Sequence, residues 1–96
     1  MKKINIKSEF SQDYISREAG EKLRTIILEN VKTGAPLTLD FSGLLVASTS
    51  FFDEGFAKLT SEGWDQKKLF QTITFEGLHP KDKMILDEMC KNRGMR

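Results

Sequence analysis

Residues 37–56 read LTLDFSGLLVASTSFFDEGF, and this segment decides the fold. Its first half alternates apolar and polar residues and then becomes fully apolar, a pattern typical of a strand in a mostly buried sheet. In its second half Ser50 can cap a helix, and Asp53 follows three residues later as the reciprocal acidic partner. The segment therefore predicts a strand that leads into a helix through a hydroxyl-rich turn, Ala47–Ser50 (the hydroxyl turn).

The rest of the chain supplies further strands and helices around this segment. Apolar residues recur every four positions from Ile15 to Val31, which predicts a helix that starts at Ser16 or Asp13 and ends near Lys32–Gly34. The other predicted elements are a strand over Lys2–Ser8, a helix over Phe51–Ser61 closed by Gly63, a strand over Leu69–Phe75, and a helix that starts at Pro80, after which Asn92–Arg96 should fray.

The predicted order of elements is strand, helix, strand, helix, strand, helix. Such alternation predicts an α/β fold in which parallel strands are joined by right-handed crossovers and helices pack on the sheet. The sheet is small, with three strands and three helices, and we expect the strand order 2-1-3. Because 96 residues have room for one core, we expect a single domain, 1–96.

Charge and composition exclude several classes of protein. Fifteen basic and fourteen acidic residues give a formal net charge of +1, so no overall field attracts nucleic acid or an anionic membrane. The first residues lack the apolar run of a signal peptide and no segment is long enough to span a membrane, so we expect a soluble cytoplasmic protein. One cysteine, Cys90, and one histidine, His79, provide no structural zinc site, and we expect neither metal nor cofactor. We expect the free Cys90 to be a buried apolar residue of the last helix.

Two adjacent phenylalanines follow the hydroxyl turn and cannot both face the centre of one buried stripe. Phe51 and Phe52 are about 100° apart around a helix axis. Phe52 continues with Phe56 and Leu59 four and seven residues later, so it belongs to the core face. We therefore expect Phe51 at the margin, as part of a partially exposed apolar surface.

The hydroxyl turn does not contain a recognisable catalytic site. A serine nucleophile needs a base within hydrogen-bonding reach, and the one histidine, His79, lies beyond the third predicted strand as a helix cap before Pro80. The segment Ala47–Phe51 has no glycine for a strained nucleophile turn, and no glycine-rich phosphate loop follows the strand. The acidic pair Asp53–Glu54 is explained by the favourable position of acids in a first helical turn. We therefore expect no enzymatic activity.

Residues 39–51, LDFSGLLVASTSF, resemble the segment LDLSGVTFIDSSG of STAS domains, the fold of anti-sigma-factor antagonists, without a gap. The flanking elements follow a similar order. The chain resembles still more closely a bacterial STAS-like family of undefined function, marked by Thr49-Ser50-Phe51 and the pair Asp53-Glu54 after an aspartate-containing strand. The resemblance implies a STAS-like fold over most of the chain.

In STAS antagonists a partner kinase phosphorylates the second serine of the DSSG motif, and this switches binding to that kinase. Ser50 holds that position, so the resemblance implies Ser50 as the phosphorylation candidate. Ser48 stands where the motif has aspartate, and Phe51 stands where it has glycine and could create a fixed apolar docking spot. The resemblance also implies that a leading strand and a final strand and helix are missing, and a homodimer would cover the resulting open edge.

The resemblance implies a non-enzymatic regulatory module that binds another protein, such as a kinase-like ATPase or an anti-sigma factor. The expected partner-binding residues are Ser48, Thr49, Ser50, Phe51 and Glu54. Two alternatives remain open. One is a small-ligand or nucleotide-binding module that uses the amino end of the second predicted helix, and the other is an enzyme that uses Ser50 with His79.

Overall fold

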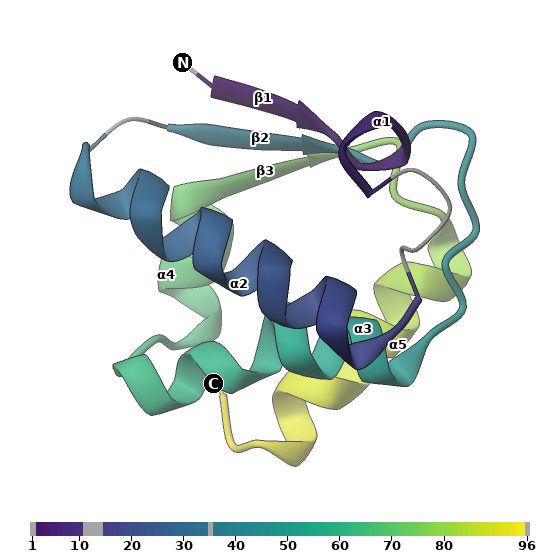
Figure 1. Cartoon of the computed structure of the whole chain (residues 1–96). Helices are drawn as coiled ribbons and strands as arrows, with labels where there is room; N and C mark the ends of the chain where they lie inside the picture. The colour runs from purple at the N-terminus through teal and green to yellow at the C-terminus, as the bar shows by residue number, and fades with distance from the viewer. Residues whose placement is uncertain (1, 11–14, 35, 96) are drawn as a thin grey trace.

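Three short parallel strands form the sheet of the computed structural model, which describes residues 2–10, 15–34 and 36–95. The strands are β1 (Lys2–Asn5), β2 (Leu37–Asp40) and β3 (Ile73–Glu76). Both neighbouring pairs are parallel, and the spatial order is β1-β2-β3 (Figure 1). The predicted α/β class with a parallel three-stranded sheet is therefore confirmed.

The predicted strand order 2-1-3 is wrong, because β2 and not β1 is central. A central strand has neighbours on both edges, and the first three residues of β2 are all buried. β1 alternates instead, with buried Ile4 between exposed Lys3 and Asn5. This alternation suits an edge strand with one face toward solvent.

The helices α2, α3, α4 and α5 lie on one side of the sheet, and α1 lies at its end (Figure 1). The helices are α1 (Ile6–Phe10), α2 (Arg17–Lys32), α3 (Thr49–Gly55), the 3₁₀-helix η1 (Ala57–Glu62), α4 (Gln66–Thr72) and α5 (Pro80–Asn92). The described residues thus form five α-helices, whereas three helices were predicted. The opposite face of the sheet carries polar side chains, and Lys3 of β1 reaches Glu76 of β3 across it at 2.8 Å.

Two of the predicted strands are shorter than expected because side chains cap helices next to them. β1 ends at Asn5, whose Oδ1 accepts a hydrogen bond from the Ser8 amide at 2.9 Å where α1 begins. β3 starts only at Ile73, because Asp65 Oδ1 accepts from the Lys68 amide at 2.7 Å and caps α4. Such local bonds give the backbone an alternative to the sheet.

The decisive segment also contains less regular structure than predicted. After β2 the chain forms a loop, since Gly43 turns it with a φ of 78°, and Leu44 and Val46 enter the core from this loop. The helix predicted over Phe51–Ser61 is divided into α3 and η1. Gly63 ends η1 with a φ of 83°, so the predicted stop is confirmed.

The predicted starts of the first and last long helices are confirmed. Ser16 caps α2 by accepting a hydrogen bond from the Ala19 amide at 3.1 Å. Asp13, the alternative cap, lies outside the described residues. His79 caps α5, and Pro80 occupies its first turn.

Met95 packs back on the protein, whereas Asn92–Arg96 were predicted to fray; Arg96 lies outside the described residues. The Met95 amide donates to the Cys90 carbonyl at 2.9 Å, and the Met95 side chain is buried. Cys90 is buried as predicted. Burial raises the pKa of its thiol to about 11, so the thiolate that would react is scarce at neutral pH.

Phenylalanines fill the space between the sheet and the helices. Phe41, Phe51, Phe52 and Phe56 are all fully buried. Phe41 stacks on Phe52 with ring centroids 6.2 Å apart, and Phe51 meets Phe52 edge-on at 5.6 Å. Both residues of the adjacent pair therefore belong to the core, which fixes the rotation of α3 beneath the sheet.

Helices α2 and α3 approach each other closely at a pair of glycines. A Cβ at Gly20 would lie 2.7 Å from the Glu54 Cβ and 2.8 Å from the Phe51 carbonyl oxygen. A Cβ at Gly55 would lie 3.5 Å from the Gly20 carbonyl oxygen. The backbone at Gly20 thus touches α3 directly, and a side chain there would push the two helices apart.

The substitution Gly20→Ala is expected to destabilise the protein by about 1–3 kcal/mol, because the added methyl group overpacks the contact with α3. In an unconstrained helix the same change stabilises by up to about 1 kcal/mol, so the sign is diagnostic. Urea unfolding measures the change, with exposed Glu21→Ala on the same helix as control. A Gly20→Ala protein as stable as wild type would contradict the close approach.

Candidate functional site

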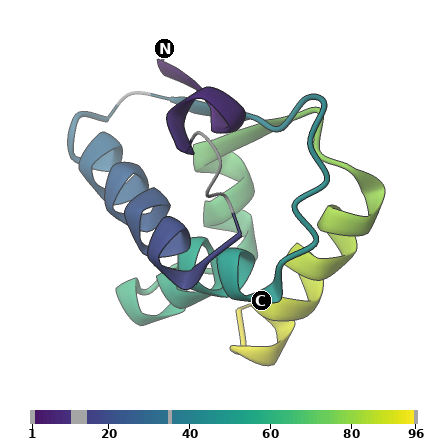
Figure 2. The ribbon, with the colours of Figure 1, turned by 45° about the vertical axis from the view of Figure 1, so that its right-hand side comes forward.

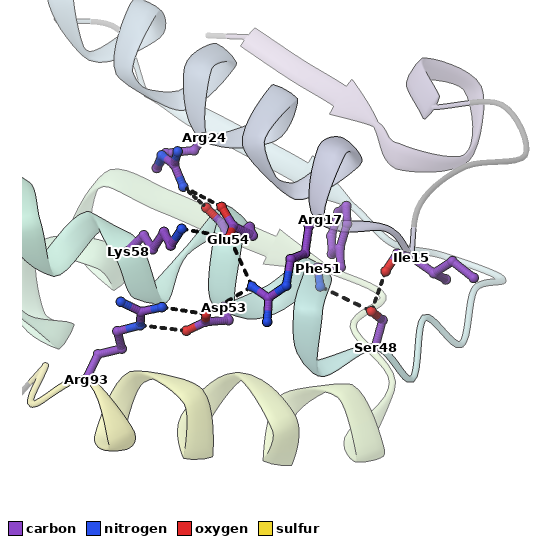
Figure 3. Close-up of polar contacts among 9 residues, drawn as sticks. All are labelled: Ile15, Arg17, Arg24, Ser48, Phe51, Asp53, Glu54, Lys58 and Arg93. Atoms are coloured by element: carbon purple, nitrogen blue, oxygen red, sulfur yellow. Dashed lines mark hydrogen bonds and ion pairs between the residues drawn. The ribbon is translucent and has the colours of Figure 1, made fainter.

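Ser48 holds the hydroxyl turn in place as the N-cap of α3. Its Oγ accepts a hydrogen bond from the Phe51 amide at 3.1 Å and donates one to the Ile15 carbonyl (Figure 3). The first bond caps α3, and the second ties the turn to the residues that lead into α2. The Ser48 hydroxyl is therefore both a hydrogen-bond donor and a hydrogen-bond acceptor in the fold.

Ser50 is not the cap that was predicted. Because α3 begins at Thr49, Ser50 lies inside its first turn, and Asp53 is ion-paired rather than part of a capping box. Thr49 is exposed and Ser50 is half-buried. The Ser50 side chain makes no hydrogen bond to any residue that the structure describes. Its hydroxyl and that of Thr49 have no hydrogen bond to the described residues, whereas the Ser48 hydroxyl has two.

Two residues predicted to bind a partner are buried, and the predicted partial exposure of Phe51 is wrong. Phe51 is fully buried, because α1 places the Phe10 ring edge-on against it with centroids 5.9 Å apart. Glu54 is 6% exposed and lies against α2. Of the other predicted contact residues, Thr49 is exposed, and Ser48 and Ser50 are half-buried.

The first residue of the hydroxyl turn and the loop before it are held by a carboxylate that sequence reasoning missed. Asp82 in the first turn of α5 is fully buried and accepts hydrogen bonds from the amides of Val46 (2.7 Å) and Ala47 (2.8 Å). Ala47 has a φ of 50°, unusual for a residue with a side chain, so the loop needs such support. Figure 2 shows this loop descending from the sheet toward α3 with α5 beside it. The sequence gives one weak signal, an acid directly after His79-Pro80-Lys81.

Two exposed apolar side chains flank the turn, and neither was predicted as part of a site. Ile15 is 53% exposed and Leu45 is 48% exposed. The Ile15 carbonyl accepts the Ser48 hydroxyl bond, and its side chain points away from Ser48 in Figure 3. Leu45 precedes the two amides that Asp82 holds. Ile15 and Leu45 are thus exposed apolar side chains on a backbone that hydrogen bonds hold in place. Exposed apolar groups that gather in one place often mark a site of interaction.

The two carboxylates of α3 lie at the centre of an ion-pair network (Figure 3). Glu54 accepts Lys58 at 2.7 Å, Arg17 at 3.0 Å and Arg24 at 3.2 Å. Asp53 receives both Nε (2.8 Å) and Nη2 (2.7 Å) of Arg93, with Arg17 at 3.6 Å. The network joins α2, α3, η1 and the end of α5.

These partners keep both carboxylates ionised. The pKa of Glu54 is lowered from its ordinary 4.5 to about 2, first by the hydrogen bond from Lys58 and then by those from Arg24 and Arg17, against the opposing effect of burial. The pKa of Asp53 is lowered mainly by its hydrogen bonds from Arg93. A buried charge is tolerated only with such partners, so the network is first of all structural.

The candidate catalytic pair of Ser50 and His79 is not joined in the described part of the chain. His79 Nδ1 accepts a hydrogen bond from the Lys81 amide at 3.1 Å, and no described bond joins His79 to Ser50. The described ranges contain no group of three or more His, Cys, Asp or Glu side chains that could hold a metal ion. Nor does any helix in those ranges have the length and apolar character needed to cross a membrane.

Comparison with protein families assigns most of the chain to a family. A family model described as a STAS-like domain of unknown function matches residues 19–83. The matched part contains α3, the hydroxyl turn and segment 39–51, so the resemblance noticed in the sequence is confirmed. Searches of curated proteins and of solved structures found no match.

The substitution Glu54→Gln is expected to destabilise the protein by about 1–3 kcal/mol at pH 7, because it removes charge-assisted hydrogen bonds to three cations. The folded-state pKa is the lower one, so the charge of Glu54 stabilises the fold above pH 4.5. That contribution is lost as the pH falls from 4.5 toward 2. The difference between wild type and variant should therefore shrink over this interval.

Denaturant unfolding at several pH values measures this difference. Glu88→Gln, which removes an exposed carboxylate from α5, serves as the control and should cost little at any pH. A Glu54→Gln deficit that stays constant down to pH 2 would show that the charge of Glu54 is not what the cations stabilise.

Proposed function

The chain belongs to the family of STAS-like domains of unknown function, and from its site we propose that it is a non-enzymatic regulatory module that binds another protein. The observation that carries this proposal is the pair of exposed apolar side chains beside the hydroxyl turn. We define the contact surface as Ile15, Leu45, Thr49 and Ser50. It replaces the predicted surface that included buried Phe51.

Rigidity of the contact surface supports a role in binding. The backbone near Leu45 is held by the Asp82 carboxylate, and Ile15 is held through its carbonyl by Ser48. A surface that is ordered before binding loses less conformational entropy when a partner docks. Exposed apolar side chains supply the favourable burial that such docking needs.

Phosphorylation of Ser50 is the proposed switch. Its hydroxyl has no described partner, so modification would break no hydrogen bond of the described fold. A phosphate would add nearly two negative charges to the first turn of α3, and desolvating those charges in an apolar interface is unfavourable. The family resemblance supports a kinase-like ATPase or an anti-sigma factor as partner, and a cytoplasmic location is part of the same proposal.

The alternative of a ligand site at the amino end of α3 has less support. α3 has seven residues, so its dipole is small, and the Phe51 amide already donates to Ser48. A protein partner would bury the exposed side chains of Ile15 and Leu45. A small anionic ligand at the amino end of α3 would not account for their exposure.

Replacing Leu45 or Ile15 with Asp is expected to remove partner binding without unfolding the protein, because both side chains are about half exposed. The matched control is Met84→Asp on α5, whose side chain is 70% exposed at another place. Tagged proteins are purified from the native cells under mild cross-linking, and co-purifying proteins are compared by mass spectrometry.

The expected result is a specific protein that is recovered with wild type and with Met84→Asp but is depleted at least tenfold with both contact-surface variants. Circular dichroism confirms that each variant is folded. Equal recovery of every co-purifying protein with all four proteins would place the function elsewhere on the molecule.

Ser50 is expected to carry a phosphate in protein purified from its native cells, because its hydroxyl is partly accessible and unbonded. Phosphopeptide mass spectrometry locates the group. Thr49→Ala is the neighbouring control and should keep the modification, whereas Ser50→Ala should lose it. Finding no phosphate on Ser50 across growth conditions would leave a constitutive contact surface without this switch.

Stability measurements separate the two serines. Ser48→Ala should cost roughly 1 kcal/mol, because it removes the N-cap of α3. Ser50→Ala should stay within about 0.5 kcal/mol of wild type. The reverse order would mean that Ser50 caps the helix after all.

A further inference from the structure

The ion-pair network carries more positive than negative charge. The two carboxylates of α3, Asp53 and Glu54, have four cationic partners: Arg17, Arg24, Lys58 and Arg93. Four positive and two negative charges leave an excess of two positive charges. Like charges held this close repel one another, so the fold stabilises a cluster that lacks part of its counter-charge.

Two of the four cations face a cavity. Lys58 and Arg93, together with Thr60 and Ser61, line a cavity of about 420 Å³ between η1 and the end of α5. We call it the basic cavity. No carboxylate is among its described lining residues. Its volume lies within the roughly 300–1,000 Å³ that small-molecule sites occupy.

Both cations of the basic cavity keep unused donors. Lys58 Nζ has one described partner, Glu54 Oε1 at 2.7 Å, out of three possible N–H bonds. Arg93 uses Nε and Nη2 for Asp53, which leaves Nη1 for another acceptor. In Figure 3 the two side chains approach α3 one above the other from the same side. Their carboxylate partners fix their positions, so the donors are placed in advance.

Two hydroxyl groups complete the lining. Thr60 Oγ1 donates to the Ala57 carbonyl at 2.8 Å, and Ser61 Oγ donates to the Lys58 carbonyl at 2.7 Å. Both are bonds of η1 to its own backbone. A hydroxyl hydrogen can rotate toward a stronger acceptor, and an anion is such an acceptor. The cavity thus offers an ammonium, a guanidinium and two hydroxyls to one ligand.

We propose that the basic cavity binds a phosphate group, either as inorganic phosphate or as the phosphate of a small phosphomonoester. A dianion adds negative charge to a network in which four cations surround two carboxylates. Its oxygens match the separated donors of Lys58 and Arg93, and a guanidinium is well suited to tetrahedral oxyanions. This site is independent of the contact surface and of any modification of Ser50.

Two-dimensional NMR of the full chain tests the proposal. Inorganic phosphate is titrated at constant ionic strength against sodium chloride, and amide shifts are followed. The expected result is saturable shifts of the amides of residues 58–63 and of Arg93, with a higher melting temperature in phosphate. Shifts that do not saturate, that are reproduced by chloride, or that fall elsewhere would overturn the site.

A parallel titration with phenyl phosphate distinguishes the two sources of the phosphate group. Tighter binding of phenyl phosphate than of inorganic phosphate assigns the cavity to phosphomonoesters, and the reverse assigns it to the free ion. Absence of saturable binding by both compounds would overturn the proposal.

Two variants test the named side chains. Lys58→Gln should weaken the binding of phosphate roughly tenfold or more. Lys67→Gln makes the same charge change at an exposed residue of α4 and should leave the affinity unchanged. Because Lys58→Gln also removes a partner of Glu54, Arg93→Lys is a second variant that keeps the charge and loses the guanidinium. It should fold and bind several-fold more weakly. Wild-type affinity in both variants would exclude Lys58 and Arg93 as ligands.

Discussion

The contact between Gly20 on α2 and Glu54 on α3 is the constraint on which the rest of the structure depends. Without a side chain at Gly20 the two helices approach until the Glu54 stem lies against the α2 backbone. This burial would be unfavourable for a carboxylate alone, and three cations from α2 and η1 offset it. The close packing of α2 against α3 therefore depends on the three cations that neutralise Glu54.

The same contact divides α3 into a buried face and a more accessible face. With Glu54 against α2, the helix is rotated so that Phe51 and Phe52 both enter the core. Thr49 and Ser50 are then left at the surface. The phenylalanine that stands at the glycine position of the family motif is thus a packing residue here, held by Phe10 of α1. It is the exposed loop residue Leu45 that supplies apolar surface.

Local signals in the sequence predicted local structure well and long-range structure poorly. The four-residue periodicity, the Ser16 cap and His79-Pro80 located two helices, because caps and amphipathic faces act within a few residues. The strand order was missed because it depends on which strand finds neighbours on both edges. The resemblance of residues 39–51 to the STAS motif predicted the family correctly, and these residues lie inside the matched region.

The site was predictable only in part for the same reason. Two serines two residues apart could each cap α3, and the choice of Ser48 is accompanied by a bond to the Ile15 carbonyl, 33 residues away. The hydrogen bonds of Asp82 to the loop join residues that are 35 and 36 positions apart, so the sequence near the turn does not predict them. Contacts of this kind exist only once α2 and α5 are in place.

Helix α5 is fixed to the α3 region at both of its ends. Its first turn holds the loop before α3 through Asp82, and the residue after its last turn holds Asp53 through the paired bonds of Arg93. Any displacement of α5 has to break a buried carboxylate clamp at one end and a bidentate ion pair at the other. The loop before α3 and α3 itself are therefore both bonded to α5, so the backbone of the hydroxyl turn is positioned by the fold itself.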